Sequence, residues 1–184
     1  MRLDAADAIS FDFFPLLKAH CRNQKSDFWL MGEVVHGDYY RWANDEMLDS
    51  TTNYEAYKGL YSSHLDCNLF EIAYSLNRQF SEDGIYKDLT LYNFVDNHDV
   101  NRLASNLKNP AHLYTIYGLL FTMPGIPSLY YGSEWGIAGK RTDQSDHMLR
   151  PTLSLDKVDA PEPDLIRHPF GIHEKIGHLV FYIC

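Results

Sequence analysis

Residues 89–99 read Leu-Thr-Leu-Tyr-Asn-Phe-Val-Asp-Asn-His-Asp, an apolar run that turns abruptly polar. The run from Leu89 to Val95 predicts a buried strand. The polar residues Asp96-Asn97-His98-Asp99 stand where that strand ends. In folds built on parallel strands, the chemistry lies at the carboxyl ends of the strands. A functional site is therefore expected at this strand end.

The same change from an apolar strand to polar residues recurs along the chain. Strands are predicted at Met1-Arg-Leu-Asp4, at Phe28-Trp-Leu-Met31 before Gly32-Glu33, weakly around 47–54, and at Gly125-Ile-Pro-Ser-Leu-Tyr-Tyr-Gly132. Apolar residues at helical spacing predict helices over 13–21, 69–80 and 111–123. Residues 38–66 are expected to be loop-rich, and the chain from Ala138 onward irregular. Strands alternating with helices predict an α/β fold with parallel strands.

Composition favours one globular domain and argues against several classes of partner. A chain of 184 residues is long enough to bury a sizeable core. A net charge of −9 argues against a nucleic-acid partner and fits a neutral substrate. No apolar run approaches the roughly 18 residues of a membrane span, so no membrane partner is expected. Three scattered cysteines, Cys21, Cys67 and Cys184, show no metal-ligand spacing, which favours a reduced, cytoplasmic setting.

Three carboxylates, Asp4, Glu33 and Asp99, lie at or just past strand ends. Arg2 is two residues from Asp4 on one strand, and a fixed guanidinium favours the ionised carboxylate that a nucleophile needs. Glu33 follows an apolar run, and apolar surroundings favour the protonated form that a general acid needs. Two carboxyls driven in opposite directions are what glycoside hydrolysis by double displacement requires.

Each of these motifs also has a plainer interpretation. An Arg-x-Asp pair is most often a structural ion pair on the surface. The segment Asn97-His98-Asp99 is also compatible with a turn or with part of a metal site, although no third ligand recurs at a telling spacing. The ordered combination of the three carboxylates favours catalysis, with no metal ligands predicted.

Four blocks of the chain, taken together, resemble the α-amylase family, glycoside hydrolase family 13. The blocks are Arg2-Leu-Asp-Ala-Ala, Gly32-Glu-Val-Val-His-Gly, Phe94-Val-Asp-Asn-His-Asp99 with Arg102, and Gly125-Ile-Pro-Ser-Leu-Tyr-Tyr-Gly-Ser-Glu134. They are similar to the family's fourth, fifth, seventh and eighth strand blocks, and the resemblance extends to about residue 167. It implies that Asp4 is the nucleophile, Glu33 the acid/base and Asp99 the transition-state support. Arg2, His98 and Arg102 are expected to bind substrate.

The same resemblance implies an incomplete (β/α)8 barrel, strands four to eight, with the first three strands absent. Residues 1–184 are then an incomplete catalytic domain, in which 138–184 form an irregular tail and the start of the last helix. Such a fragment is expected to be poorly soluble or to have little activity alone. Secretion stays open, because the true N-terminus is expected to be missing.

One departure from the family pattern bears on binding. Many family members have a Lys-His pair where this chain has Asp7-Ala8, and its histidine helps to bind calcium. A structural calcium ion is therefore conceivable in the parent enzyme but not supported here, and the chemistry requires no cofactor. His36 is expected to reach an acceptor subsite, and Asp38, Tyr39, Tyr40 and Trp42 to line the cleft.

The function expected from these residues is retaining hydrolysis of α-glucosidic bonds in starch-like substrates, maltodextrins or maltooligosaccharides. Two alternatives remain at this point. One is transglycosylation, in which an acceptor sugar replaces water at the same intermediate. The other is a non-catalytic α-glucan-binding fragment. Linkage preference and oligomeric state are not predicted.

Overall fold

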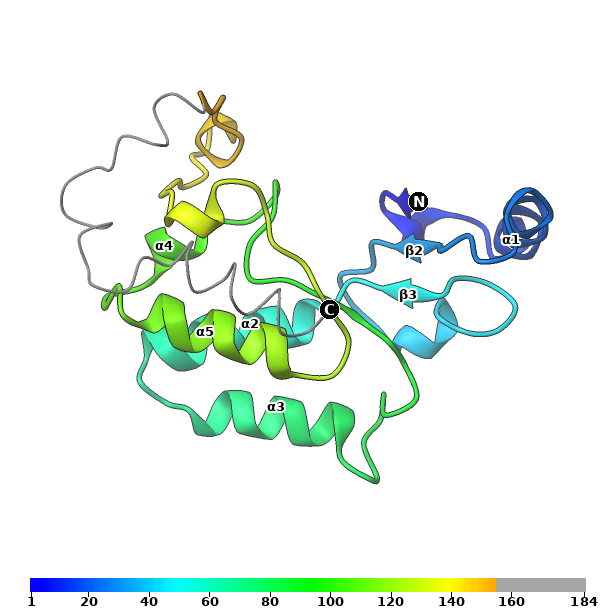
Figure 1. Ribbon diagram of the computed structural model, residues 1–184, viewed down its shortest axis with the longest axis horizontal. Helices are drawn as coiled ribbons and strands as arrows, with labels where there is room; N and C mark the ends of the chain where they lie inside the picture. Colours follow the sequence, from blue (N-terminus) through cyan, green and yellow to red (C-terminus); the bar gives the residue numbers. More distant parts are fainter. Residues whose placement is uncertain (155–184) are drawn as a thin grey trace.

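The computed structural model describes residues 1–154 (Figure 1). Its strands are short, parallel and arranged in chain order. They are β1 (Arg2–Leu3), β2 (Met31–Gly32), β3 (Ser50–Thr51), β4 (Tyr92–Asn93) and β5 (Ile126–Pro127). β1, β2 and β3 form one sheet, and β4 pairs with β5 in another. A parallel bridge from Thr52 to Tyr92 joins β3 to β4. The carboxyl ends of all five strands therefore lie along one edge of a continuous arc.

Helices connect most of these strands, as the sequence predicts. α1 (Phe13–Gln24) leads to β2, α2 (Tyr54–Leu65) and α3 (Phe70–Phe80) lead to β4, and α4 (Leu103–Asn106) and α5 (His112–Thr122) lead to β5. The helices expected over 13–21, 69–80 and 111–123 are confirmed as α1, α3 and α5. The expected strands are found at the right places, but pairing is limited to two residues in each.

The expectation of a loop-rich segment over 38–66 is wrong in its second half, which forms the 12-residue α2. Its buried positions include Gly59, Ser63 and His64, so it lacks the apolar stripe that reveals an amphipathic helix. Gly59 serves close packing, because a Cβ at that position would lie 3.3 Å from Ile72 on α3. The signal that was present is Asn53, whose side chain accepts a hydrogen bond from the amide of Ala56 and caps the helix.

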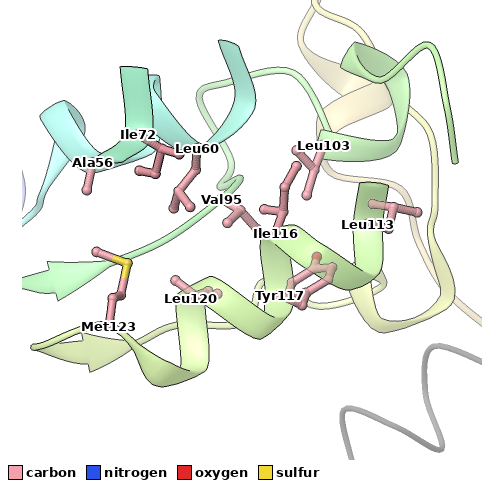
Figure 2. Close-up of a cluster of buried hydrophobic side chains, with 10 residues drawn as sticks. All are labelled: Ala56, Leu60, Ile72, Val95, Leu103, Leu113, Ile116, Tyr117, Leu120 and Met123. Atoms are coloured by element: carbon pink, nitrogen blue, oxygen red, sulfur yellow. The ribbon is translucent and has the colours of Figure 1, made fainter. Parts of the chain in front are cut away.

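The core consists of two clusters of buried apolar side chains. The first packs α2, α3, α4 and α5 against Val95, which follows β4 (Figure 2). The second surrounds α1 and β2 and includes Phe14, Leu30 and Leu48, all with 0% exposure. Tyr39 and Trp42 belong to this second cluster, at 3% and 5% exposure, so the expectation that they line the cleft is wrong. Their rings are part of the core.

Beyond β5 the described chain has little regular structure. It forms two single-turn 3-10 helices, η3 (Ser133–Trp135) and η4 (His147–Leu149). The expected start of the last helix, at Asp164, lies outside the described residues. The loop from β5 to Arg150 folds back over the end of β4, where it contributes to the site.

Candidate active site

The carboxyl ends of the strands surround a cavity of about 150 Å³. Its walls come from four of the five strands: Arg2 lies on β1, and Thr52 and Asn97 follow β3 and β4. Ser128 and Tyr130 follow β5 and form the opposite wall. Because the strands are parallel, residues distant in sequence converge here, as expected for a site at strand ends.

Arg2 connects the first two predicted catalytic carboxylates. Its Nη2 atom lies 2.7 Å from Glu33 Oε2 and 3.7 Å from Asp4 Oδ1. The structure thus places both carboxylates beside the same guanidinium nitrogen. The nearer partner is Glu33, whereas the sequence predicts Asp4, because Glu33 follows the strand directly paired with β1.

The two carboxylates differ sharply in exposure. The side chain of Asp4 is 82% exposed, and that of Glu33 is 10% exposed. The surroundings of Glu33 are not the apolar ones that the sequence predicts. Tyr54 donates a hydrogen bond to Oε1 at 3.1 Å, and Arg2 contacts Oε2. Glu33 is therefore a buried carboxylate whose two oxygens are both held by donors.

A chain of hydrogen bonds links Glu33 to the residues after β4. Asn97 Nδ2 donates to the Tyr54 hydroxyl at 3.4 Å, and Asn97 Oδ1 accepts from the amide of Asp99 at 2.8 Å. Burial raises the pKa of Tyr54 to about 12, and the negative charges of Glu33 and Asp99 add to this rise against the opposing bond from Asn97. The Tyr54 hydroxyl therefore keeps its proton at neutral pH and serves as a donor.

Asp99 is held by two basic groups. His98 Nε2 lies 3.0 Å from Asp99 Oδ2, and Arg150 Nη2 lies 3.3 Å from Asp99 Oδ1. Arg150 also pairs with Asp146 at 2.8 Å and donates to the carbonyl of His98 at 3.1 Å. The loop after β5 thus fixes the predicted His98 and Asp99 pair, while His98 lines the cavity.

Two predicted substrate-binding residues lie in contrasting places. Arg102 has 0% exposure and donates to the carbonyl of Tyr131, beneath the cavity. A side chain without exposed surface presents no face to a sugar, so the predicted substrate contact of Arg102 is wrong and the residue has a supporting position. His36 is exposed on the loop after Glu33, where its predicted contact with an acceptor stays a prediction.

Sequence reasoning missed Tyr54 and Arg150 as parts of the site. Tyr54 opens α2 directly after the Asn53 cap, so recognition of that cap would have placed it beside a strand end. Arg150 lies in the irregular segment, 51 residues from Asp99, and no local sequence pattern predicts that it belongs to the site. Among residues 1–154, no group of three or more His, Cys, Asp or Glu side chains is arranged to hold a metal ion.

Comparison with known proteins agrees with this geometry. A family model described as "Alpha amylase, catalytic domain" matches residues 7–175. The chain belongs to the alpha-amylase family. Catalytic domains of the alpha-amylase family form a (β/α)8 barrel, and the parallel α/β arc described above is part of such a fold. Arg2 and Asp4 precede the matched range.

Several relatives within the alpha-amylase family are similar to this chain. The maltogenic alpha-amylase of Bacillus acidopullulyticus is 27% identical over 75% of this chain and 24% of its own length. The intracellular maltogenic amylase of Bacillus subtilis is 22% identical, over 85% of this chain and 26% of its own. The crystal structure of a maltogenic amylase from S. marinus is 27% identical and superposes with a TM-score of 0.72, over 99% of this chain and 25% of that one. The chain spans about a quarter of the length of the curated relatives it matches.

No helix among the described residues is both long and apolar enough to cross a membrane.

Proposed function

We propose that this chain carries the catalytic groups of a retaining glycoside hydrolase for α-glucosidic bonds in starch-like or maltodextrin substrates. The observation that carries the proposal is the position of Arg2 Nη2 between Asp4 and Glu33. The distances of 3.7 Å and 2.7 Å from one guanidinium nitrogen place the two carboxylates close enough to act on the same glycosidic bond. Retention follows from the proposed role of Asp4 as nucleophile in a double displacement.

The proposed roles follow from exposure. Asp4 is open to an incoming sugar, and its carboxylate attacks the anomeric carbon as the glycosidic bond breaks. Glu33, positioned by Arg2 and Tyr54, is the proposed acid, and in its protonated form it donates that proton to the leaving oxygen. The resulting glycosyl ester on Asp4 is then attacked by a water molecule, whose proton returns to Glu33. Two carboxyls and one water balance the reaction, and no cofactor takes part.

The remaining residues support the same steps. Asp99, oriented by His98 and Arg150, is placed to bind sugar hydroxyls as charge develops in the transition state. In this proposal β1 to β5 correspond to strands four to eight of the family's barrel. The substrate class is inferred from the maltogenic relatives, and a cytoplasmic location from the relative named as intracellular.

The test is release of reducing sugar from starch, maltotriose and isomaltose, on which the chain alone, as an incomplete barrel in this proposal, is expected to act slowly. Asp4→Asn and Glu33→Gln are each expected to lower kcat by roughly a thousandfold or more, because each removes a group that forms or breaks a bond. Asp27→Asn is the matched control, since Asp27 is an exposed acid paired with Lys25 on the surface. Activity that survives both site substitutions would overturn the proposal. Products longer than the substrate would assign transglycosylation to the same intermediate.

A further inference from the structure

A buried polar network connects the segment after β4 to the loop after β5, and its Asp96 contributes to the lining of the cavity. Asp96 is the first residue of the polar segment after β4 and is 2% exposed. Its carboxylate oxygens accept from the Ser133 hydroxyl at 2.8 and 2.9 Å, and Oδ2 accepts from the amide of Leu103 at 2.9 Å. Ser133 belongs to η3, so this contact joins the loop after β4 to the loop after β5.

Arg102 makes the second connection between the same two loops. Its Nη1 donates to the carbonyl of Tyr131 at 2.7 Å and to Ser133 Oγ at 3.2 Å. Its guanidinium carbon lies 4.1 Å from the ring centroid of Tyr130. Two further nitrogens of Arg102 have no hydrogen-bond partner within residues 1–154, and stacking on Tyr130 compensates part of that cost.

Ser133 connects Asp96 to Arg102 in this network. A serine hydroxyl has one proton to donate and lone pairs to accept with. It donates to Asp96 and accepts from Arg102, so one side chain links the carboxylate to the guanidinium. The three residues Asp96, Arg102 and Ser133 are called the clamp below.

The clamp brackets the segment that carries the predicted transition-state support. Asp96 and Arg102 stand at either end of residues 97–101, which include His98 and Asp99. On the other side, Tyr130 and Ser128 form the opposite wall of the cavity. The clamp therefore connects the two segments that form these walls.

We propose that Arg102 and Ser133 are positioning residues that set the distance between the Asp99 segment and the Tyr130 wall. This inference rests on the proposed function, because the distance affects a rate only if the site catalyses the proposed reaction. Neither side chain contacts the sugar: both act through the segments they hold. Misplacement of a reacting group by about 1 Å lowers a rate by as much as a hundredfold.

The experiment compares Ser133→Ala with Ser105→Ala. Both changes remove one serine hydroxyl that ties the same region together, since Ser105 Oγ accepts from the amide of Gly139 at 2.7 Å. Similar losses in Tm are expected. Ser133→Ala is expected to lower kcat roughly ten- to a hundredfold with little change in KM, and Ser105→Ala to leave kcat near that of the original chain. Arg102→Lys, which keeps the charge but not the stacked planar group, is expected to follow Ser133→Ala.

A second readout does not require turnover. The amides of Asp99 and Val100 donate to Asn97 Oδ1, so they report the order of the clamped segment. Their hydrogen exchange is expected to be roughly tenfold faster in Ser133→Ala and unchanged in Ser105→Ala. Equal kcat values, or equal exchange rates at these amides in the two variants, would overturn the inference. If the original chain is inactive, the result counts against the proposed function. Faster exchange in Ser133→Ala would in that case still support the role of the clamp in ordering the Asp99 segment.

Discussion

Arg2 is the residue that joins the two proposed catalytic carboxylates. One of its nitrogens contacts both Asp4 and Glu33, so it sets their separation as well as their charge environment. In the proposed mechanism the two carboxylates take different roles because one is open to solvent and the other is enclosed by Tyr54 and the start of the chain. The structure distinguishes them by exposure and hydrogen bonding, in place of the apolar environment expected for Glu33.

Tyr54→Phe tests the hydroxyl that holds Glu33. The ring packs edge-on against Phe94 at 4.9 Å, so the variant is expected to keep its Tm within a few degrees. Loss of one hydrogen bond to a charged group is expected to lower kcat on maltotriose by roughly tenfold. Tyr74→Phe, at a tyrosine that is 70% exposed, is the control. Equal kcat values for both variants would show that Glu33 needs no help from Tyr54.

For single residues, the sequence predicts which residues lie at the site better than it predicts what their side chains contact. Asp4, Glu33, His98 and Asp99 are found at strand ends as expected. The pair of Arg2 with Asp4 follows from their spacing. The contacts of Tyr54 with Glu33 and of Arg150 with Asp99 could not be predicted, because these partners lie 21 and 51 residues apart along the chain. Arg102 shows the same limit: its motif is recognisable, but its burial depends on a loop that has no periodic pattern.

The elements are predictable where one face is uniformly apolar. α1, α3 and α5 bury such faces and were expected, whereas α2 buries Gly59, Ser63 and His64 and was not. Strand positions follow from apolar runs before polar residues. Their two-residue pairing could not be predicted, because it depends on where neighbouring segments diverge into the loops that form the site.

Asp49 joins the helix α1 to the sheet and gives a pH-dependent prediction. Burial acts to raise its pKa, but the amide of Leu30 and the cations Lys18 and Arg22 outweigh burial and hold the pKa below the usual 3.8. A lowered pKa stabilises the fold above the unfolded value, and the contribution is lost as pH falls through the folded value. Asp49→Asn is therefore expected to cost about 1–2 kcal/mol at neutral pH.

The difference between the original chain and Asp49→Asn is expected to shrink as pH falls below the usual value of 3.8, because the carboxyl becomes neutral in both states. Urea unfolding at neutral pH and near pH 3 measures it. Asp27→Asn, at a side chain that is 74% exposed, is expected to change stability little at either pH. A cost for Asp49→Asn that is the same at both pH values would contradict this account.

The molecule as a whole is an arc of parallel strands whose order in space equals their order in the chain. In the described part of the structure β1 pairs with β2 alone and β5 with β4 alone, so each end of the arc offers an unpaired edge. The parallel arrangement was predictable from the alternation of strands and helices. The curvature of the arc was not, since it depends on packing between segments far apart in sequence.

Unpaired strand edges favour association of one chain with another. Light scattering of the 184-residue chain is expected to show a mean mass that rises with protein concentration. Phe70→Ser is the contrast, because Phe70 is 86% exposed on the helix α3 and belongs to neither edge strand. The variant is expected to associate as the original chain does. A monomeric mass over the whole concentration range would contradict edge pairing, and association lost in Phe70→Ser would assign it to the apolar surface.

The assignment of Asp4 as nucleophile is tested most directly by trapping the covalent intermediate. A fluorinated α-glucosyl fluoride that forms the glycosyl ester quickly and releases it slowly is incubated with the chain, and the digested protein is analysed by mass spectrometry. The account predicts one added fluoroglucosyl group on the peptide that contains Asp4, and none in Asp4→Asn. A label on Asp99 or another residue, or turnover of maltotriose by a chain that takes no label, would contradict it.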